Sequence, residues 1–385
     1  MRLFDEGAYR KGTASIKWDF QKQEYGTDGL LPFSIADADY PIYKPVLEAI
    51  KLRIDNGVLG YTDADKSYFA AVSGWAFRRH GWTINNNWIV PVSSIVPGIA
   101  NLIEVFTNPG DKIIVQPPVY APFYSVVNAT GRELIKNGLI LSGGRYIMDY
   151  KGLEKACAGG AKMLILCSPH NPVCRLWSEE ELIALSEICF KYCVIVVSDE
   201  IHWDLALGGG KHFTMGRVNK LHEQLIVCTS CSKTFNIAGL QTSNFIIPDK
   251  FLRDKFKNWL YGRYMFCPNA LGMEAVKAAY TYGDRWADEQ QAYLTENAYL
   301  VRDFMSDHLP RVKLAQPEAT YLLWLDMRAY GLSSEELVRL IARAGAALNS
   351  GLHYGGGYDG FLRMNVACPQ KQLYSGLECI KIALS

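Results

Sequence analysis

Short apolar runs, each bounded by polar or small residues, recur through the middle of the chain. Runs of this length and setting are typical of buried β-strands. They predict strands over residues 112–115, 162–167, 193–197, 225–227 and 244–247. Near-continuous apolar strands that alternate with helices are usually covered on both faces. The pattern therefore predicts an α/β fold built on a mostly parallel sheet.

Helical spacing of apolar residues marks the segments around these strands. It predicts helices over residues 45–56, 66–80, 178–192, 268–282, 285–308 and 333–344, one that begins near residue 97 and one from residue 370 onward. Gly57 ends the first of them. Ser178 with Glu181, and Ser333 with Glu336, have the capping-box spacing that marks two helix starts.

The predicted elements divide the chain into three regions. Residues 1–44 hold many aromatic residues and few periodic segments, which predicts an extended arm with a strand running into a turn over 34–41. Residues 45–283 form a large domain. Residues 284–385, with strands predicted over 320–326, 347–348 and 361–366, form a smaller α/β domain that the arm joins.

Composition narrows the possible partners. The 385 residues are 49% hydrophobic, and 40 basic against 39 acidic residues give a formal net charge of +1. This balance disfavours nucleic acid and anionic membranes as partners. No apolar run is long enough to span a bilayer, and residues 1–12 lack the apolar core of a signal peptide. We therefore expect small molecules or copies of the same chain as partners.

Cysteine usage indicates the compartment. Ten cysteines without a secretory signal favour a reducing, cytoplasmic setting. Cys228 and Cys231 have CxxC spacing, but no second pair completes a metal-ligand set, so we expect no metal site.

Lys233 is the first candidate for chemistry. It follows the apolar run 225–227 in a turn that also holds Ser230 and Ser232. A lysine at the end of a buried strand is partly desolvated, so its free amine becomes available as a nucleophile. Schiff-base formation is the expected chemistry. Taken alone, the pattern also fits a solvent-facing loop lysine.

Three more polar residues follow predicted strand ends. Tyr120, Asn171 and Asp199 come after three strands other than the one before Lys233. Because ligands of parallel α/β sheets bind beyond the carboxyl ends of the strands, we expect these side chains to converge. Ile95 and Val96 lie where a strand gives way to a helix, and their N–H groups would favour a phosphate.

These residues carry a resemblance to a known superfamily. Gly60-Tyr61-Thr62, Tyr120, Asn171-Pro172, Asp199 to His202, the lysine segment and Arg363 occur in the order and rough spacing of fold-type I pyridoxal-phosphate enzymes, the class I/II aminotransferase superfamily. The resemblance covers about residues 35–370. It implies a large domain with a mostly parallel sheet, a smaller α/β domain built from both termini, and pyridoxal 5'-phosphate as cofactor.

Finer motifs resemble the MalY/PatB branch of cystathionine β-lyases. They are Ala36-Asp37-Ala38-Asp39, Pro169 to Pro172, Asp199 to Asp204 and Arg363 to Pro369. One departure is Cys174, where that branch usually has glycine after the Asn-Pro turn. The substitution is expected to alter the turn without touching the reacting groups.

The resemblance implies a role for each site residue. Lys233 would bind the coenzyme and remove the α-proton, and Asp199 would pair with the pyridine nitrogen. Arg363 would bind the substrate carboxylate, with Ala36 and Asn171 also at the substrate. The remaining coenzyme contacts would come from Tyr120, Asn171, His202, Ile95, Val96, Ser230 and Ser232, with Tyr120 also in a catalytic role. Tyr61 would reach the phosphate of a neighbouring subunit, which implies a homodimer.

Each residue also has a structural interpretation when it is taken alone. Asp199 fits a helix N-cap, and Arg363 fits a buried ion pair. Tyr120 fits a packed aromatic residue, and Asn171 fits a turn residue. His202 fits a structural histidine, and Tyr61 fits an ordinary loop tyrosine.

The resemblance implies α,β-elimination of cystathionine or related cysteine S-conjugates, which gives pyruvate, ammonia and a thiol. An aminotransferase would use the same residues, because both reactions begin with removal of the α-proton. A regulatory protein that keeps the fold is a third interpretation, although an intact Lys233 and Asp199 favour catalysis.

Overall fold

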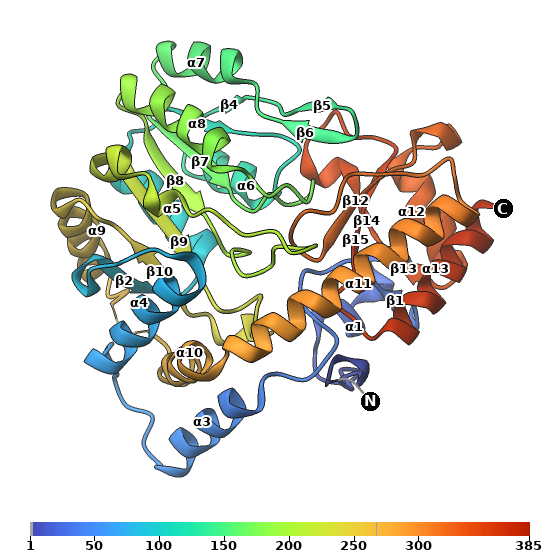
Figure 1. Cartoon of the computed structure of the whole chain (residues 1–385), viewed down its shortest axis with the longest axis horizontal. Coiled ribbons are helices and arrows are strands. Elements are labelled where there is room, and N and C mark those ends of the chain that lie inside the picture. Colours follow the sequence, from blue (N-terminus) through green and yellow to red (C-terminus); the bar gives the residue numbers. More distant parts are fainter. Residues whose placement is uncertain (1–2, 267) are drawn as a thin grey trace.

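The computed structural model describes residues 3–266 and 268–385, and a seven-stranded sheet lies at the centre of one half of this part of the chain (Figure 1). Its strand order is β2-β10-β9-β8-β7-β3-β4. All of these strands except β10 run in the same direction, because β10 is antiparallel to both of its neighbours. The strands are β2 (Ile89–Val92), β3 (Lys112–Val115), β4 (Glu133–Lys136), β7 (Met163–Cys167), β8 (Ile195–Asp199), β9 (Leu225–Thr229) and β10 (Ser243–Ile246). The predicted mostly parallel α/β sheet is confirmed.

Helices cover both faces of this sheet, as the alternation along β7 shows. Met163 and Ile165 belong to one hydrophobic cluster, whereas Leu164 and Leu166 belong to another. Successive residues of a strand point to opposite faces, so both faces are buried. The helices of this half are α3 (Lys44–Asp55), α4 (Lys66–His80), α5 (Ile95–Phe106), α6 (Pro122–Ala129), α7 (Tyr150–Ala158), α8 (Glu179–Lys191), α9 (Lys250–Gly262) and α10 (Ala270–Tyr282).

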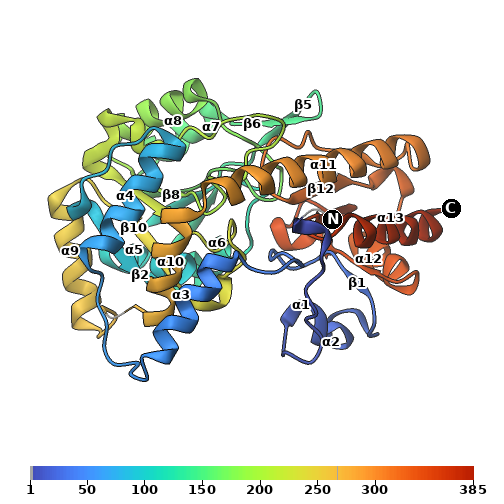
Figure 2. The ribbon, with the colours of Figure 1, turned by 60° about the horizontal axis from the view of Figure 1, so that its bottom comes forward.

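The C-terminal residues build a second sheet, joined to the first half by the long helix α11 (Asp284–His308) (Figures 1 and 2). Its order is β11-β12-β15-β14, and each neighbouring pair is antiparallel. These strands are β11 (Lys313–Leu314), β12 (Leu322–Asp326), β14 (Asn349–Ser350) and β15 (Phe361–Asn365), and helices α12 (Ser334–Arg343) and α13 (Gln370–Leu384) pack nearby. We keep residues 45–283 and 284–385 as the proposed division into domains.

The N-terminal segment lies against this second half. Strand β1 (Leu31–Pro32) pairs in parallel with β13 (Ala346–Ala347). The short helices α1 (Ile16–Asp19) and α2 (Gln21–Tyr25) precede it, so the arm is less extended than the sequence predicts. No helix among the described residues is long and apolar enough to cross a membrane.

The strand predicted at the start of residues 34–41 does not form, because the peptide groups of this segment bond to side chains and to isolated backbone groups rather than to a neighbouring strand. Asn365 donates to the carbonyls of Ile35 and Asp37, and Arg363 donates to the carbonyl of Ser34. Two boundaries also shift. Strand β8 begins at Ile195 because Cys193, with φ of 54°, sits in a left-handed turn after α8, and helix α5 begins at Ile95 rather than near residue 97.

Six further elements of the first half have no counterpart among the predicted ones. They are β4, the hairpin β5 (Ile140–Ser142) with β6 (Arg145–Ile147), and helices α6, α7 and α9. All three residues of β5 are exposed, and those of β4 are exposed or half-buried, so neither strand is of the fully buried kind that the apolar pattern predicts.

Candidate active site

A single pocket opens at the carboxyl ends of β3, β7, β8 and β9. The space between its lining residues, including the part open to solvent, is about 770 Å³. Tyr120, Asn171, Asp199 and Lys233 all line it. The structure thus brings together the four residues that the sequence places after strand ends. The other lining residues are Ala36, Ser94, Ile95, Val96, Cys167, Ile201, His202, Ser232, Ala238, Gln241, Thr242 and Ser243.

Lys233 reaches the pocket from the turn after β9. Its Nζ donates a hydrogen bond of 2.6 Å to the carbonyl oxygen of Ala36, a pocket residue from the N-terminal segment. Burial lowers the pKa of Lys233 to about 8, since Asp37 and Asp199 only partly offset the loss of water. An amine with this pKa is partly unprotonated near neutral pH, as a nucleophile or base requires.

Asp199 is the last residue of β8 and is 4% exposed. Its Oδ1 accepts a hydrogen bond of 3.1 Å from the backbone of Ile201. Burial raises the pKa of Asp199 to about 7, against the opposing effects of this hydrogen bond and of Lys233. A buried carboxyl group with so little compensation favours a cationic or hydrogen-donating partner in the pocket.

The first turn of α5 forms an anion cradle. Ser94 is the N-cap in an extended conformation, and its side chain makes no capping hydrogen bond. Ser94, Ile95 and Val96 all line the pocket, so the positive end of this helix points toward it. Backbone N–H groups in this setting are a ready site for phosphate.

The two serines of the lysine segment divide between the pocket and its support. Ser232 lines the pocket, whereas Ser230 lies behind it. The Ser230 hydroxyl donates to the carbonyl of Thr242 at 2.9 Å and lies 2.7 Å from the Ser232 hydroxyl. Ser230 therefore supports Ser232, and its own contact with a ligand stays a prediction.

Arg363 lies beside the pocket on β15 and is 4% exposed. Nη1 donates to Asn171 Oδ1 at 3.3 Å, and Nη2 donates to Asn349 Oδ1 at 2.8 Å and to the carbonyl of Ser34 at 2.5 Å. Nε is buried without a hydrogen-bond partner among the described residues. All of these partners are neutral, so the guanidinium keeps its charge available for a carboxylate.

The remaining predicted residues differ in their setting. His202 is buried in the pocket wall, where burial holds its pKa well below the usual value and keeps the ring neutral. Its Nδ1 has no hydrogen-bond partner in the described part of the chain. Tyr61 is fully exposed in the loop after α3 and does not line the pocket of its own chain.

Several pocket residues are missing from the sequence-based prediction. Gln241 and Thr242 reach the pocket from the segment before β10, Ser243 is the first residue of that strand, and Gln241 has φ of 47°. Tyr321 supports the wall by donating to the carbonyl of Ala36 at 3.0 Å. A glutamine or tyrosine has no spacing signal of its own, so these contacts emerge only from the fold.

The structure shows how the turn after Asn171-Pro172 accommodates Cys174 in place of the usual glycine. It is fully buried and has φ of 60°, a conformation that favours glycine. Its thiol lies 2.9 Å from the carbonyl of Leu322 and donates to it. The cysteine thus occupies a glycine-type position and fixes the turn to β12, and it does not line the pocket.

Comparison with known proteins places this pocket in a family. The family model described as aminotransferase class I and II matches residues 29–380. The chain belongs to this family. Cystathionine beta-lyase PatB from Bacillus subtilis is 42% identical over 385 residues, which covers 99% of this chain and 100% of that protein.

Two solved structures share the whole architecture. Cystalysin from Treponema denticola, whose crystal structure contains a pyridoxal 5'-phosphate cofactor, has a TM-score of 0.95 and 33% identity over 99% of this chain and 98% of that one. The PLP-bound C-S lyase from Staphylococcus hominis has a TM-score of 0.93 and 31% identity over 100% of this chain and 98% of that one. The fold-type I architecture of the family is therefore established for this chain.

Proposed function

We propose that this protein is a pyridoxal-phosphate-dependent carbon–sulfur β-lyase that acts on cystathionine or a related cysteine S-conjugate. The observation that carries the proposal is the pocket itself, in which the Lys233 amine, the buried Asp199 carboxyl group and the N-terminus of α5 converge. Full-length similarity to a cystathionine beta-lyase favours elimination over other reactions of the family.

The donor set fits pyridoxal phosphate. The N–H groups of Ile95 and Val96, with the Ser232 hydroxyl, would hold the phosphate, and Lys233 would bind the aldehyde carbon. Asp199 supplies the acceptor that a protonated pyridine nitrogen needs. The other ring contacts would come from Tyr120, Asn171 and His202. When bound, the coenzyme supplies an electron sink for the charge left at the substrate Cα.

The residues of the chain would then divide the work. Arg363 would bind the substrate carboxylate through paired hydrogen bonds and, with Asn171, orient Cα. Lys233, once its amine is free, would take the proton from Cα. In elimination, the electrons of that C–H bond form a Cα–Cβ double bond while the Cβ–S bond breaks. The sulfur leaves as a thiol, and water releases pyruvate and ammonia.

Elimination and transamination differ in what they need to continue. Elimination returns the enzyme to its starting form in every cycle, whereas transamination stops until a 2-oxo acid accepts the nitrogen. We expect the purified protein to release pyruvate and thiol from cystathionine over many turnovers with no 2-oxo acid present. Product limited to one turnover per site, with turnover resuming when 2-oxoglutarate is added, would identify an aminotransferase instead.

We also propose that the active unit is a cytoplasmic homodimer in which Tyr61 completes the site of the partner. The segment around it exposes large apolar side chains: Leu52 is 74% exposed, Val58 64% and Tyr61 100%. Helix α3 packs against α10, and the loop after it lies at an outer edge of the chain in Figures 1 and 2. Exposed apolar surface of this kind favours contact with another protein, and a second copy would cover it.

A further inference from the structure

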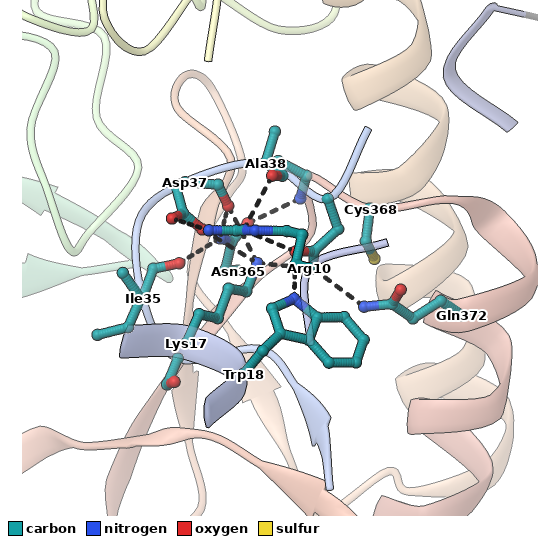
Figure 3. A network of polar contacts seen from close by, with 12 residues as sticks. Arg10, Lys17, Trp18, Ile35, Asp37, Ala38, Asn365, Cys368 and Gln372 are labelled. Carbon is teal, nitrogen blue, oxygen red and sulfur yellow. Dashed lines mark hydrogen bonds and ion pairs between the residues drawn. The ribbon is translucent and has the colours of Figure 1, made fainter. Parts of the chain in front are cut away.

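Arg10 and Lys17 of the N-terminal segment bind the carboxylates of Asp37 and Asp39, and Figure 3 shows Arg10, Lys17 and Asp37. Arg10 donates to both carboxylate oxygens of Asp37, at 2.8 and 2.6 Å, and to Asp39 Oδ1 at 2.9 Å. Lys17 Nζ lies 2.8 Å from Asp39 Oδ2 and donates to the carbonyl of Asp37 at 3.0 Å. The Lys17 and Asp39 side chains are each 1% exposed, whereas those of Arg10 and Asp37 are 21% and 23% exposed, so the cluster has one buried and one half-buried side.

Further side chains lock the same segment. Trp18 Nε1 donates to Asp39 Oδ1 at 2.9 Å, and Gln372 donates to Asp39 Oδ2 at 3.1 Å. Asn365 Nδ2 donates to the carbonyls of Ile35 and Asp37, at 2.5 and 2.7 Å. Elements from both termini therefore fix residues 35–39 (Figure 3).

This segment is also the wall against which the reactive lysine rests. The carbonyl of Ala36 accepts the hydrogen bond from Lys233 Nζ at 2.6 Å, and Asp37 is the next residue. The cluster around Asp37 thus begins one residue away from the group that Lys233 contacts. No such connection is apparent from the sequence, since Arg10 and Lys233 are far apart along the chain.

The charges that face Lys233 come from three elements besides its own. Asp37 lies on the N-terminal segment, Asp199 on β8 and Arg363 on β15, while His202 nearby is neutral. Burial acts to raise the pKa of Asp37, but the hydrogen bond from Arg10 and the charges of Lys17 and Arg10 outweigh it and lower that pKa. Asp37 is therefore ionised at neutral pH and favours the protonated form of Lys233.

We propose that Asp37 is a positioning residue that sets how tightly the Lys233 amine holds its proton, and that Arg10 limits the strength of this effect. The active site then extends beyond the pocket to the N-terminal segment. The consequence for catalysis rests on the proposed function, because only there does Lys233 act as a base. The electrostatic effect itself is a property of the chain and is testable without turnover.

Asp37→Asn and Arg10→Gln test the proposal because they change the charge near Lys233 in opposite directions. The readout is the rate at which acetic anhydride labels Lys233 in the coenzyme-free full-length chain, followed against pH by mass spectrometry of the peptide that contains Lys233. We expect Asp37→Asn to lower the midpoint of this titration by about half a pH unit or more, and Arg10→Gln to raise it. Arg10→Lys keeps the charge and should stay near wild type.

A matched control is Asp303→Asn, which removes an aspartate paired with Arg302 at the surface and should leave the midpoint unchanged. If the cluster were only structural, Asp37→Asn and Arg10→Gln would both loosen the wall. Shifts of the same sign, or no shift in either variant, would overturn the proposal. If circular dichroism shows that Asp37→Asn does not fold, the comparison of Arg10→Gln with Arg10→Lys decides alone, by whether the midpoint rises only when the charge is lost.

The labelling result is independent of the proposed function. Opposite shifts in a protein that releases no pyruvate would support this inference and remove the lyase proposal. Pyruvate release with unshifted midpoints would support the lyase proposal and overturn the role proposed for Asp37 and Arg10.

Discussion

At the scale of single residues, the pocket is defined by ionisable groups that the chain buries without full compensation. Asp199 has only the Ile201 N–H and the Lys233 charge to offset its loss of water, and Lys233 has lost water too. A protein that binds no ligand here gains nothing from this arrangement, because an under-compensated buried charge costs stability. A ligand that supplies the missing charged or hydrogen-bonding partner would offset this loss of stability.

Asp199→Asn in the coenzyme-free chain should reveal this cost through its pH dependence. The pKa of Asp199 rises from 3.8 to about 7 on folding, so its neutral form stabilises the fold below pH 3.8, and that contribution is lost as the pH rises to about 7. Asparagine does not ionise. We therefore expect the variant to gain stability over wild type, by on the order of 2 kcal/mol more at pH 8 than at pH 5.

Urea unfolding of both proteins at the two pH values measures this difference, with Asp303→Asn as the surface control. An equal effect of Asp199→Asn at both pH values would mean that the carboxyl group is well solvated or fully paired, which would contradict its assigned setting.

The sequence predicts residues at this scale unevenly. Tyr120, Asn171, Asp199 and Lys233 are found because each follows an apolar run, and parallel strands bring their carboxyl ends together. Arg10 and Asp37 are not found as a pair, because nothing in local spacing links charges that meet only after the N-terminal segment folds back. The sequence does not predict the hydrogen bond from the Ser230 hydroxyl to the carbonyl of Thr242, because the two residues meet only when β9 and β10 pair.

At the scale of elements, sequence patterns predict structure best where the interacting residues lie within one helical turn of each other. Both predicted capping boxes form, at the starts of α8 and α12, and α4 spans the predicted residues 66–80. Residues 34–41 fail as a strand because their partners are side chains of β15, a contact that depends on the assembled fold. Apolar periodicity indicates which residues are buried. It does not indicate which groups will form hydrogen bonds with the backbone N–H and C=O groups.

Arg175 links three elements near the Asn-Pro turn. It donates to both oxygens of Glu181 in α8, at 2.5 and 2.7 Å, and to the carbonyl of Tyr146 in β6 at 2.6 Å, and it pairs with Glu318 before β12. Its side chain is 1% exposed. Arg175→Met would fill similar space but leave two carboxylates without this cation.

We expect Arg175→Met to lower the free energy of unfolding by about 3 kcal/mol, near the lower end for a broken buried pair because Arg145 still contacts Glu318. Arg285→Met is the matched control. Its side chain is 89% exposed and pairs with Glu289 within α11, so its loss should leave the urea midpoint close to that of wild type. Similar midpoints in urea for both variants would show that the Arg175 cluster adds no stability.

At the scale of the whole molecule, the N-terminal segment connects the two halves of the site. It pairs through β1 with β13, supplies Ala36 to the pocket and places Arg10 beside Asp37. The same chain leaves Tyr61 exposed on the loop after α3. The segment that holds Arg10 and Ala36 thus completes the site of its own chain. The loop that holds Tyr61 is proposed to complete the site of a partner chain.

Mixing two variants that each lack one group of the proposed shared site tests that exchange. Lys233→Ala lacks the amine, and Tyr61→Phe lacks the hydroxyl proposed to reach the phosphate of the partner. In a hybrid dimer, one site combines Lys233 of the Tyr61→Phe chain with Tyr61 of the Lys233→Ala chain and is therefore intact. Unfolding and refolding the two chains together at equal amounts should restore about a quarter of the wild-type rate of pyruvate release, because about half of the dimers are hybrids with one intact site each.

The control replaces Tyr61→Phe with Asp199→Asn. Asp199 and Lys233 line the pocket of one chain, so no hybrid of Asp199→Asn with Lys233→Ala contains an intact site, and mixing should restore nothing. If the Tyr61→Phe mixture recovers no more activity than this control, Tyr61 acts within its own chain or not at all. Recovery only in the Tyr61→Phe mixture requires two chains at each site, and the exposed apolar side chains around Tyr61 then belong to the interface that brings them together.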